Sequence, residues 1–502
     1  MKFNNPAVDM SQTTNYEDAP AYNESPELAL YTLACTSLME DQFYRPTNQV
    51  INELTELVKQ CNPEFVAKLA IYARKEMNLR SLPVAMAVTL CLTHKHPSVS
   101  KCISGVIQRV DEITEILSYF AMVNQNATKE KPLTKIPSII KKAIKSVFES
   151  GRFDEYQYAK YNRDGSVKLK DALFLTHPSP KGKENEEELS HLWKKIADNK
   201  LETPYTWETE LSKGKDRKET WESLISSEKV GYMATLRNLR NILNANVSDG
   251  HIDTVARFVG SDQVYKSKQF PFRFWSAYRE LKELPQTEPR EKFIYALETA
   301  IRKSIKSYPD FKGNVLIACD TSGSMNDPLS KKSSLKLFEV GLVFGALLQK
   351  ELPRAAVGQF AETFEMLNTR EGVLDTADDF IKQQGNVGYS TNGHLAIDHI
   401  SHHKITVDQV IMFTDCQPWD NVDSYIRSHK SASLQNSWMH YTANINKNAE
   451  LWLFDLSGYG TTPIRIQGNV HLIGGWNDRI FDAVNRIKGG QSTVDIIMST
   501  NL

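Results

Sequence analysis

The chain has 502 residues, of which 41% are hydrophobic and 10% aromatic. This length and this share of apolar side chains are enough for about two to four separately packed cores. The 60 basic and 61 acidic side chains give a formal net charge of −1, which excludes a protein that binds nucleic acid through its overall charge. Basic side chains are nevertheless in excess within residues 51–350 and acidic ones at both ends, so a polyanion site is expected in the middle of the chain.

Six cysteines are spread along the chain without a CxxC pair, at Cys35, Cys61, Cys91, Cys102, Cys319 and Cys416. Such spacing argues against a disulfide framework and against structural zinc, and it favours a reducing compartment. Residues 1–25 lack the apolar core of a signal peptide, and the sequence contains no run of about 18 apolar residues. We therefore expect an intracellular protein, located in the cytoplasm and without membrane contact.

The predicted elements begin after an acidic N-terminal segment. Residues 1–26 are rich in Asn, Asp, Glu, Pro and Thr and carry few large apolar side chains, so they are expected to form a flexible arm. From there the apolar residues recur with helical spacing. In residues 63–94 the pattern predicts two helices, which a short break before Pro83 separates. Because the connection is so short, the two helices are expected to pack antiparallel.

Similar helical blocks follow along the chain, at residues 103–121, 136–148, 221–243 and 252–258. They predict stacked helical hairpins without a strict repeat period. A highly charged insert at residues 181–189 is expected to be a solvated loop. The helical region is therefore predicted to extend over residues 27–307.

After residue 307 the pattern changes to alternating strands and helices. Short continuous apolar runs occur at residues 315–319, 357–360, 409–413 and 450–454, and a helix is predicted over residues 335–348. Strands that alternate with helices in this way form a mostly parallel, doubly wound sheet covered on both faces. The predicted fold class is therefore α plus α/β, with the helical region followed by an α/β domain over residues 308–502.

Five oxygen-bearing side chains follow the predicted strands. Asp320, Ser322 and Ser324 come directly after the first strand, Thr391 lies in a glycine-flanked loop, and Asp415 follows the strand at residues 409–413. Ligand sites of open α/β sheets lie at the carboxyl ends of strands, and these oxygens suit Mg²⁺ or Mn²⁺. A helix cap is the better explanation of Asp-x-Ser-x-Ser alone. The later threonine and aspartate favour a metal site.

The segment from Phe311 to the C-terminus resembles a von Willebrand factor A domain, and the five side chains match its metal-ion-dependent adhesion site. The resemblance implies that a divalent cation binds there and that its open position takes an acidic side chain from a protein partner. One difference is Cys416, which stands where a glycine commonly follows the last aspartate. A metal-dependent hydrolase using Asp320 and Asp415 is disfavoured, because a nucleophile needs an adjacent base and no histidine is near Ser322 in the sequence.

The central region combines basic helices with aromatic residues. Lys141 and Lys142 fall on the exposed face of a predicted amphipathic helix, with Ile144 on its buried face. In residues 158–178, lysine and arginine then alternate with tyrosine and end near His177. A single lysine-rich helix face is usually just solvated, but cations interleaved with aromatic rings suit the phosphates and bases of RNA.

These residues carry a second resemblance. Residues 160–178, together with residues 69–74, 79–83, 206–212 and 231–240, resemble the TROVE module. A TROVE module followed by a von Willebrand factor A domain is the arrangement of the Ro ribonucleoprotein autoantigen family. The resemblance implies a monomeric ring of HEAT-like helical hairpins closed by the A domain. It also implies binding of small noncoding Y RNAs on an outer basic surface, and capture of the single-stranded 3′ ends of misfolded RNAs in a central hole.

The same resemblance assigns residues to RNA binding. Lys160 and His177 match the lysine and the histidine that bind Y RNA in the family, and Arg163 lies one position from the family's arginine. Lys141 and Lys142 are further candidates. Five arginines are candidates by charge and context, although each could instead form a structural ion pair: Arg74, Arg80, Arg237, Arg240 and Arg273.

The leading hypothesis is a non-enzymatic RNA-binding protein of the Ro class that scaffolds small RNAs and inspects defective ones, with an exoribonuclease as a candidate partner. The alternative is a protein-interaction module in which the A domain recruits an acidic partner through its metal and the helical region has no RNA role. Nucleic acid that co-purifies with the protein distinguishes the two.

Overall fold

The computed structural model describes residues 11–37, 39–40, 42–124, 133–162, 165–331, 333–418 and 433–502. The chain forms two compact units, and each is assembled from separate stretches of sequence. The helical unit contains Ser37–Met39, Thr47–Thr209 and Val494–Leu502. The α/β unit contains Met1–Thr36, Glu40–Pro46 and Glu210–Thr493.

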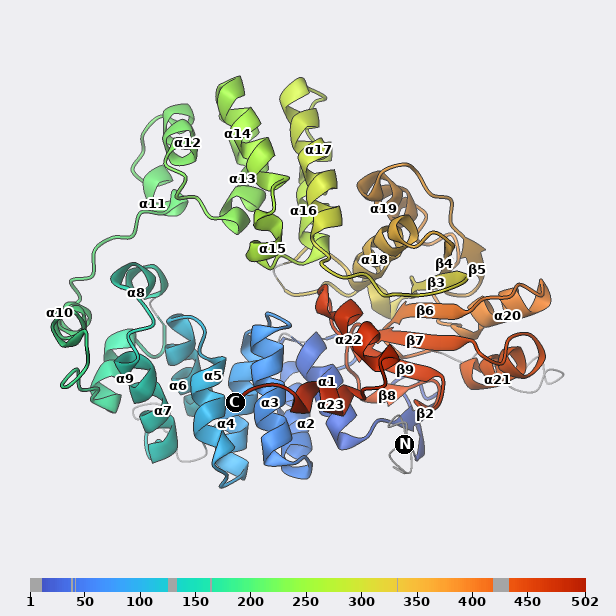
Figure 1. Ribbon diagram of the computed structural model, residues 1–502, viewed down its shortest axis with the longest axis horizontal. Helices are drawn as coiled ribbons and strands as arrows, with labels where there is room; N and C mark the ends of the chain where they lie inside the picture. Colours follow the sequence, from blue (N-terminus) through green and yellow to red (C-terminus); the bar gives the residue numbers. More distant parts are fainter. Residues whose placement is uncertain are drawn as a thin grey trace. The chain divides into compact units, whose positions relative to one another are not determined.

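The helical unit is a succession of short helices (Figure 1). Its helices are α2 (Thr47–Gln60), α3 (Pro63–Lys75), α4 (Ser81–Thr93), α5 (Ser98–Val106), α6 (Asp111–Val123), α7 (Ser138–Glu149), α8 (Glu155–Tyr161), α9 (Leu169–Thr176) and α10 (Glu186–Ala197). Helix α3 begins where the side chain of Asn62 accepts a hydrogen bond from the amide of Glu64 at 2.8 Å. Pro63 takes the first helical position, where its missing N–H costs nothing. The hairpin predicted over residues 63–94 is confirmed as α3 and α4.

Two other predictions for this unit have different outcomes. The helix predicted around residues 136–148 is confirmed as α7, with Ile144 buried and Lys142 exposed. The loop predicted over residues 181–189 is wrong in its second half, because α10 begins at Glu186. The three glutamates in its first turn favour the positive end of the helix dipole, and Leu189 and Trp193 give the helix a buried face.

The α/β unit begins with helices that continue the helical region. They are α12 (Arg217–Ser226), α13 (Tyr232–Asn244), α14 (Asp249–Val259), α15 (Gln263–Ser267), α16 (Pro271–Lys282) and α17 (Glu288–Lys303). Helix α1 (Pro26–Thr36) belongs to the same unit but packs on strand β9 (Val470–Gly474). The short helix α11 (Trp207–Leu211) contains the last residues of the helical unit and the first of this stretch. Helices α13 to α17 pack pairwise against one another, as the helical spacing up to residue 307 predicts.

Helices α16 and α17 also pack on two helices of the α/β domain, α18 (Leu337–Glu351) and α19 (Val373–Lys382). The hydroxyl of Tyr278 in α16 donates to Asp375 in α19 at 2.7 Å. The carboxylate of Glu298 in α17 accepts from the amides of Val373 at 2.8 Å and Leu374 at 2.9 Å. Glu298 thereby satisfies two amides of the first turn of α19, which have no partner inside their own helix. The end of the helical region is therefore bonded to the domain that follows it.

A six-stranded sheet forms the centre of the α/β domain (Figure 1). Its strands are β3 (Val315–Asp320), β4 (Ala355–Phe360), β5 (Phe364–Met366), β6 (Gln409–Thr414), β7 (Glu450–Asp455) and β9 (Val470–Gly474), in the order β5-β4-β3-β6-β7-β9. Every neighbouring pair is parallel except β4 with β5. In the central register Ile317 lies opposite Val357 on one side and Ile411 on the other. The predicted doubly wound, mostly parallel sheet is confirmed.

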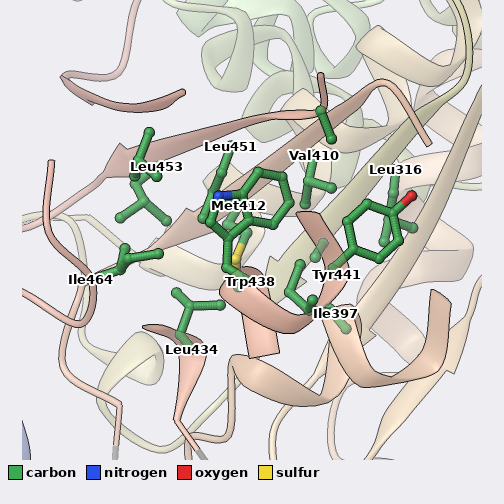
Figure 2. Close-up of a cluster of buried hydrophobic side chains, with 14 of the residues drawn as sticks. Leu316, Ile397, Val410, Met412, Leu434, Trp438, Tyr441, Leu451, Leu453 and Ile464 are labelled. Atoms are coloured by element: carbon green, nitrogen blue, oxygen red, sulfur yellow. The ribbon is translucent and has the colours of Figure 1, made fainter. Parts of the chain in front are cut away.

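Both faces of the sheet are covered by helices. Figure 2 shows Trp438 and Tyr441 of α21 (Leu434–Asn444) packed with Val410 and Met412 of β6, and α20 (His394–His402) contributes Ile397 to the same cluster. On the other face Phe413 of β6 stacks on Phe344 of α18, with ring centroids 5.5 Å apart. Alternate residues of β6 thus enter opposite cores, as the pleat of a strand requires.

The N-terminal segment is folded where the structure describes it, which differs from the predicted flexible arm over residues 1–26. From Ser11 onward, β1 (Gln12–Thr14) pairs antiparallel with β2 (Pro20–Asn23), and β2 pairs with β8 (Thr461–Thr462). The side chain of Asn15 donates to the carbonyl of Pro418 at 2.7 Å. Composition did not reveal this structure because the hairpin is held by partners far away in the sequence, through hydrogen bonds and through the ring of Tyr16, which packs on Tyr44 and Tyr459.

The C-terminal residues leave the α/β unit after α22 (Arg479–Lys488). Helix α23 (Thr493–Met498) packs in the helical unit, where the ammonium group of Lys68 donates to the carbonyl of Met498 at 2.8 Å. Ile497 is fully buried there. Among the described helices, none has both the length and the apolar composition that crossing a membrane requires.

Candidate metal centre and nucleic-acid interface

The five predicted metal ligands come together at the carboxyl ends of adjacent strands. Asp320 is the last residue of β3, and Asp415 directly follows β6, its neighbour in the sheet. Ser322 and Ser324 lie in the loop after β3. The loop that carries Thr391 is bonded to the same place, because the amide of Gly323 donates to the carbonyl of Tyr389 at 2.8 Å. All five side chains are buried.

Part of this oxygen cluster is satisfied within the protein. Asp320 accepts from the amide of Ser322 at 3.0 Å and from the hydroxyl of Thr414 at 2.7 Å. Asp415 accepts from the amide of Gln417 at 3.0 Å. The hydroxyl of Ser322 and the second carboxylate oxygen of Asp415 are buried and lack a hydrogen-bond partner among the described residues. Buried polar atoms without partners are costly, so these oxygens are available to a ligand.

The electrostatics of the cluster also fit a cation. Burial, together with the charge of Asp415, raises the pKa of Asp320 to about 7, and burial raises the pKa of Asp415 above its usual range. Two buried carboxylates this close to each other are stable as anions only beside a positive charge. Carboxylate and hydroxyl oxygens are hard donors, so the residues present fit Mg²⁺ or Mn²⁺ better than a thiophilic metal.

Cys416 keeps the loop in the shape that a glycine would allow. Its backbone has φ 59°, a left-handed conformation that is unusual for a residue with a side chain. The amide of Cys416 donates to the hydroxyl of Thr414 at 3.1 Å. Cysteine in place of the family's glycine therefore does not alter the backbone conformation of the loop that carries Asp415.

Sequence reasoning missed a third buried carboxylate beside the cluster. Asp455 ends β7 as Asp320 ends β3, and burial with the charge of Asp415 raises its pKa to about 7. One of its oxygens accepts from the amides of Ser457 and Gly458, each at 2.8 Å. The buried guanidinium of Arg45 donates to the carbonyl of Gly458 at 2.9 Å and carries the nearby positive charge. The sequence could have indicated Asp455, because it follows a continuous apolar run in the same way as Asp320 does.

The predicted RNA-binding residues of the helical unit lie beside aromatic rings. Lys160 is exposed on α8, with its ammonium nitrogen 5.5 Å from the ring centroid of Tyr156 and 5.7 Å from that of Tyr161. The guanidinium of Arg109 lies 4.1 Å from the Tyr161 ring centroid and pairs with Asp111 at 2.8 Å. Asp111 thus neutralises Arg109, whereas the ammonium group of Lys160 beside the two rings suits a phosphate. Arg163 lies outside the described residues.

His177 caps the helix that follows this cluster. It is exposed at the C-terminal end of α9, with φ 45°, and its amide donates to the carbonyl of Leu173 at 3.0 Å. On the same helix Phe174 is 55% exposed, and Tyr156 on α8 is 42% exposed. Sequence reasoning missed Phe174. The sequence did contain an indication that Phe174 is exposed, because it lies outside the helical stripe of apolar residues that begins at Leu169 and forms the buried face of α9.

Arg80 and Arg74 are surrounded by carboxylates instead. Arg80 forms ion pairs with Asp111 at 2.9 Å, Glu112 at 3.3 Å and Glu115 at 2.8 Å. Arg74 is buried and pairs with Glu112 at 2.8 Å. These carboxylates neutralise the two guanidinium groups, so the geometry favours a structural role over contact with phosphate.

The remaining basic candidates lie on helix surfaces. Lys142 is exposed and Lys141 half-buried on α7. In the α/β unit, Arg240 pairs with Glu280 at 2.9 Å. Arg237 and Arg273 lie near each other on α13 and α16, where burial and the positive charge of Arg237 lower the pKa of Arg273. Among the described residues Arg237 has no carboxylate within ion-pair distance, so these two arginines form a small local positive patch.

The comparisons with known proteins agree with this geometry. The TROVE domain family matches residues 23–200 and 198–295. A stretch of 141 residues is 28% identical to telomerase protein component 1 of Rattus norvegicus, and the Mus musculus protein matches to the same extent. These alignments cover 27% of this chain and 5% of each relative. The fold is similar to the crystal structure of the Deinococcus radiodurans Ro (RSR) protein, with a TM-score of 0.61 and 14% identity over 92% of this chain and 100% of that chain.

Stacked helical hairpins followed by a doubly wound domain of the von Willebrand factor A type define a protein of the Ro fold class. The match of residues 23–200 and 198–295 to the TROVE domain family identifies the family itself. The chain belongs to the TROVE domain family, the family of the Ro RNA-binding proteins.

Proposed function

We propose that this protein is a non-catalytic RNA-binding protein that holds small noncoding, Y-like RNAs and the single-stranded 3′ ends of misfolded RNAs, as part of a ribonucleoprotein in RNA quality control. The observation that carries the proposal is a set of exposed residues, Lys160 and Tyr156 on α8 and Phe174 and His177 on α9, here called the aromatic–basic surface. It combines positive charge with rings that water reaches.

The proposed division of labour follows from the chemistry of RNA. Lys160 would meet phosphates, which supply affinity, and Phe174 and Tyr156 would stack on unpaired bases. His177 and Arg163 would join the same contacts. Weaker, non-specific attraction would come from Lys141, Lys142, Arg237 and Arg240. Arg80 would contribute only indirectly, by holding α6 in place through its ion pairs.

A gel-shift experiment tests this surface with a structured RNA that carries a free 3′ tail. Lys160→Ala, Phe174→Ala and His177→Asn are compared with wild type, and asparagine is chosen at 177 because it tolerates the left-handed backbone there. Each variant is expected to weaken binding by about 1–3 kcal/mol. The matched control is Lys59→Ala, whose lysine is exposed and paired with Glu56. Undiminished binding in all three variants overturns the assignment of the surface.

The oxygen cluster supports a second proposal, a Mg²⁺ or Mn²⁺ held by Asp320, Ser322, Ser324, Thr391 and Asp415. Its support is the unpartnered hydroxyl of Ser322 and the unpartnered oxygen of Asp415. Such a metal would polarise or anchor an acidic group, and an exoribonuclease or another acidic protein would be a partner of this kind. We propose that the protein acts as a monomer in the cytoplasm, with its domains at residues 27–307 and 308–502.

The alternative function, a metal-dependent protein-interaction scaffold without an RNA role, rests on the same cluster. The ratio of absorbance at 260 and 280 nm of the purified protein separates the two. RNA that co-purifies with wild type and with Asp415→Asn, but less with Lys160→Ala, supports the RNA-binding function. Nucleic-acid-free protein that captures an acidic partner only when Mg²⁺ is present supports the scaffold.

A further inference from the structure

The β1–β2 hairpin is fastened to the loop that carries Asp415. The side chain of Asn15, in the hairpin turn, donates to the carbonyl of Pro418, and the amide of Tyr16 donates to the side chain of Gln417 at 2.9 Å. The side-chain oxygen of Asn15 also accepts from the amide of Glu17 at 2.9 Å, which fixes the turn itself. The hairpin turn therefore lies next to the proposed metal ligands, and all of these residues belong to the α/β unit.

The carboxylate of Glu17 is directed by a tyrosine that stands beside the cluster. The hydroxyl of Tyr44 donates a short hydrogen bond to Glu17. The ring of Tyr44 is held between Tyr16, with centroids 5.5 Å apart, and Tyr459, with centroids 5.4 Å apart. One stacked and one edge-on neighbour leave the phenol little freedom, so the position of the Glu17 carboxylate is set by rigid partners rather than by its own flexible side chain.

Hydrogen bonds connect the hairpin turn directly to a ligand. The side chain of Gln417 accepts from the amide of Tyr16, next to Glu17, at 2.9 Å. The amide of the same Gln417 donates to the carboxylate of Asp415 at 3.0 Å. Glu17 is thus a further carboxylate that the fold brings to a place already crowded with buried negative charge.

Such crowding is unfavourable without a cation. The five proposed ligands include two carboxylates, and Mg²⁺ or Mn²⁺ prefers six oxygens in octahedral geometry. Hydroxyl oxygens are weak donors to these ions, so a third carboxylate adds more to affinity than a water does. The hairpin offers that carboxylate from a stretch of sequence about 300 residues away from Asp320, on a turn held by its own hydrogen bonds.

We propose that Glu17 is the acidic ligand that completes the coordination of the divalent cation, so that the β1–β2 hairpin closes the metal site from within the same chain. This proposal rests on the metal site proposed above. Tyr44 is a positioning residue that acts through Glu17. Metal binding and the folding of the hairpin are then one coupled event.

Titration of the full chain with Mn²⁺, followed by the electron paramagnetic resonance signal of the free ion, tests the proposal. Glu17→Gln is expected to weaken Mn²⁺ binding roughly 10- to 100-fold. Glu17→Asp keeps the charge but shortens the side chain, and it is expected to weaken binding to a similar extent. The matched control is Asp18→Asn, which removes a neighbouring, exposed charge from the same turn and is expected to change binding by less than about threefold.

Hydrogen exchange of residues 11–25 gives a second, independent measurement. Mn²⁺ is expected to slow exchange of the hairpin amides in wild type and in Asp18→Asn, and to leave exchange unchanged in Glu17→Gln. Tyr44→Phe is expected to show an intermediate effect in both measurements, because Glu17 is still present but no longer oriented.

The outcomes separate the two proposals. If wild type binds Mn²⁺ and Glu17→Gln binds it as tightly as Asp18→Asn does, Glu17 is only a hydrogen-bond partner of Tyr44 and the inference is wrong. If wild type and Asp415→Asn alike bind no Mn²⁺, the metal site itself is wrong and the inference falls with it. RNA binding in gel shifts is measured on the same proteins and answers the RNA proposal separately.

Discussion

At the scale of single residues, Lys160 and Arg80 show how surroundings decide what a positive charge does. Lys160 has tyrosine rings beside it, whereas Arg80 has three carboxylates within 3.3 Å. In the sequence the two residues look alike, because each is a basic side chain in a helical region. Their surroundings differ because Asp111, Glu112 and Glu115, which pair with Arg80, belong to the separate helix α6. The sequence around Arg80 gives no sign of these partners.

The buried pair of Arg74 and Glu112 leads to a stability prediction. Glu112 has no exposed surface, so Arg74→Met leaves a buried carboxylate whose remaining partners are the more distant guanidinium of Arg80 and the amides of Gln108 and Arg109. We expect the free energy of unfolding of the helical unit to fall by about 3 kcal/mol. Urea denaturation measures this, with Lys59→Ala as an exposed control expected to change stability by less than about 0.5 kcal/mol. Equal stabilities of the two variants would contradict the prediction.

The raised pKa of Asp320 leads to a prediction about pH. In the metal-free folded protein this carboxyl holds its proton up to about pH 7, whereas in the unfolded chain it ionises near its ordinary value of about 3.9. The folded protein therefore holds this proton more tightly than the unfolded chain does. Asp320 does not destabilise the fold below its ordinary pKa, and it lowers the stability progressively as the pH rises from that value toward and through 7. With chelator present, Asp320→Asn should gain in melting temperature relative to wild type at pH 8, and little at pH 5.

Added Mg²⁺ should reverse this order at pH 8, because the cation stabilises the ionised carboxylates of wild type and the amide replaces one of its ligands. The measurement is a thermal melt at both pH values, with and without Mg²⁺. A difference between the two proteins that is the same at pH 5 and pH 8 would contradict the raised pKa.

At the scale of elements, the contact between α17 and α19 joins the helical region to the sheet domain. Glu298→Ala removes the acceptor of two amides at the start of α19. Loss of a helix cap costs about 1–2 kcal/mol, so exchange of the amides of Val373 and Leu374 should become about tenfold faster. Hydrogen exchange measures it, with the exposed Glu291→Gln on the same helix as control. Unchanged exchange at α19 would show that the cap contributes nothing.

The main elements could be predicted from sequence where their apolar pattern is long. The runs that became β3, β4, β6 and β7 are continuous and are bounded by loops, so burial on both faces was visible. Strands β5, β8 and β9 were not predicted, since two of them have three residues or fewer and their pairing depends on distant neighbours.

The proposed metal site shows the same limit. Asp320, Ser322 and Asp415 could be predicted because their own strands precede them. Asp455 was missed although its position matched theirs, and Glu17 was missed because nothing in residues 11–25 reveals the partners at Gln417 and Pro418. Contacts between remote parts of a chain leave little trace in composition or periodicity.

At the scale of the whole molecule, a net charge of −1 means that RNA affinity must come from local groups. We expect the logarithm of the binding constant to fall linearly with the logarithm of salt concentration, because phosphate contacts release counterions. Lys160→Ala should lower the slope by about one, whereas Phe174→Ala should weaken binding without changing it. Gel shifts at several salt concentrations measure both slopes. An unchanged slope for Lys160→Ala would remove the phosphate contact.

The C-terminal residues make a further prediction at this scale, because they complete the helical unit. Ile497→Ala should lower the stability of that unit by about 2–5 kcal/mol through loss of a fully buried side chain. Leu502→Ala, at an exposed position nearby, is the control. The rate of limited proteolysis within residues 47–209 measures the effect. Equal cleavage rates of the two variants would contradict the prediction.

The pairing of β2 with β8 also has a consequence for synthesis. Residues 20–23 are synthesised long before their strand partner at residues 461–462, which follows roughly 440 residues later. At about 5–20 residues per second the early segment waits on the order of half a minute or more without the neighbours that order it. Until then its backbone amides are open to chaperones and proteases. In the cell, closure of this strand is therefore among the last steps of maturation, and a truncated nascent chain is recognisable as unfinished by its unpaired residues 20–23.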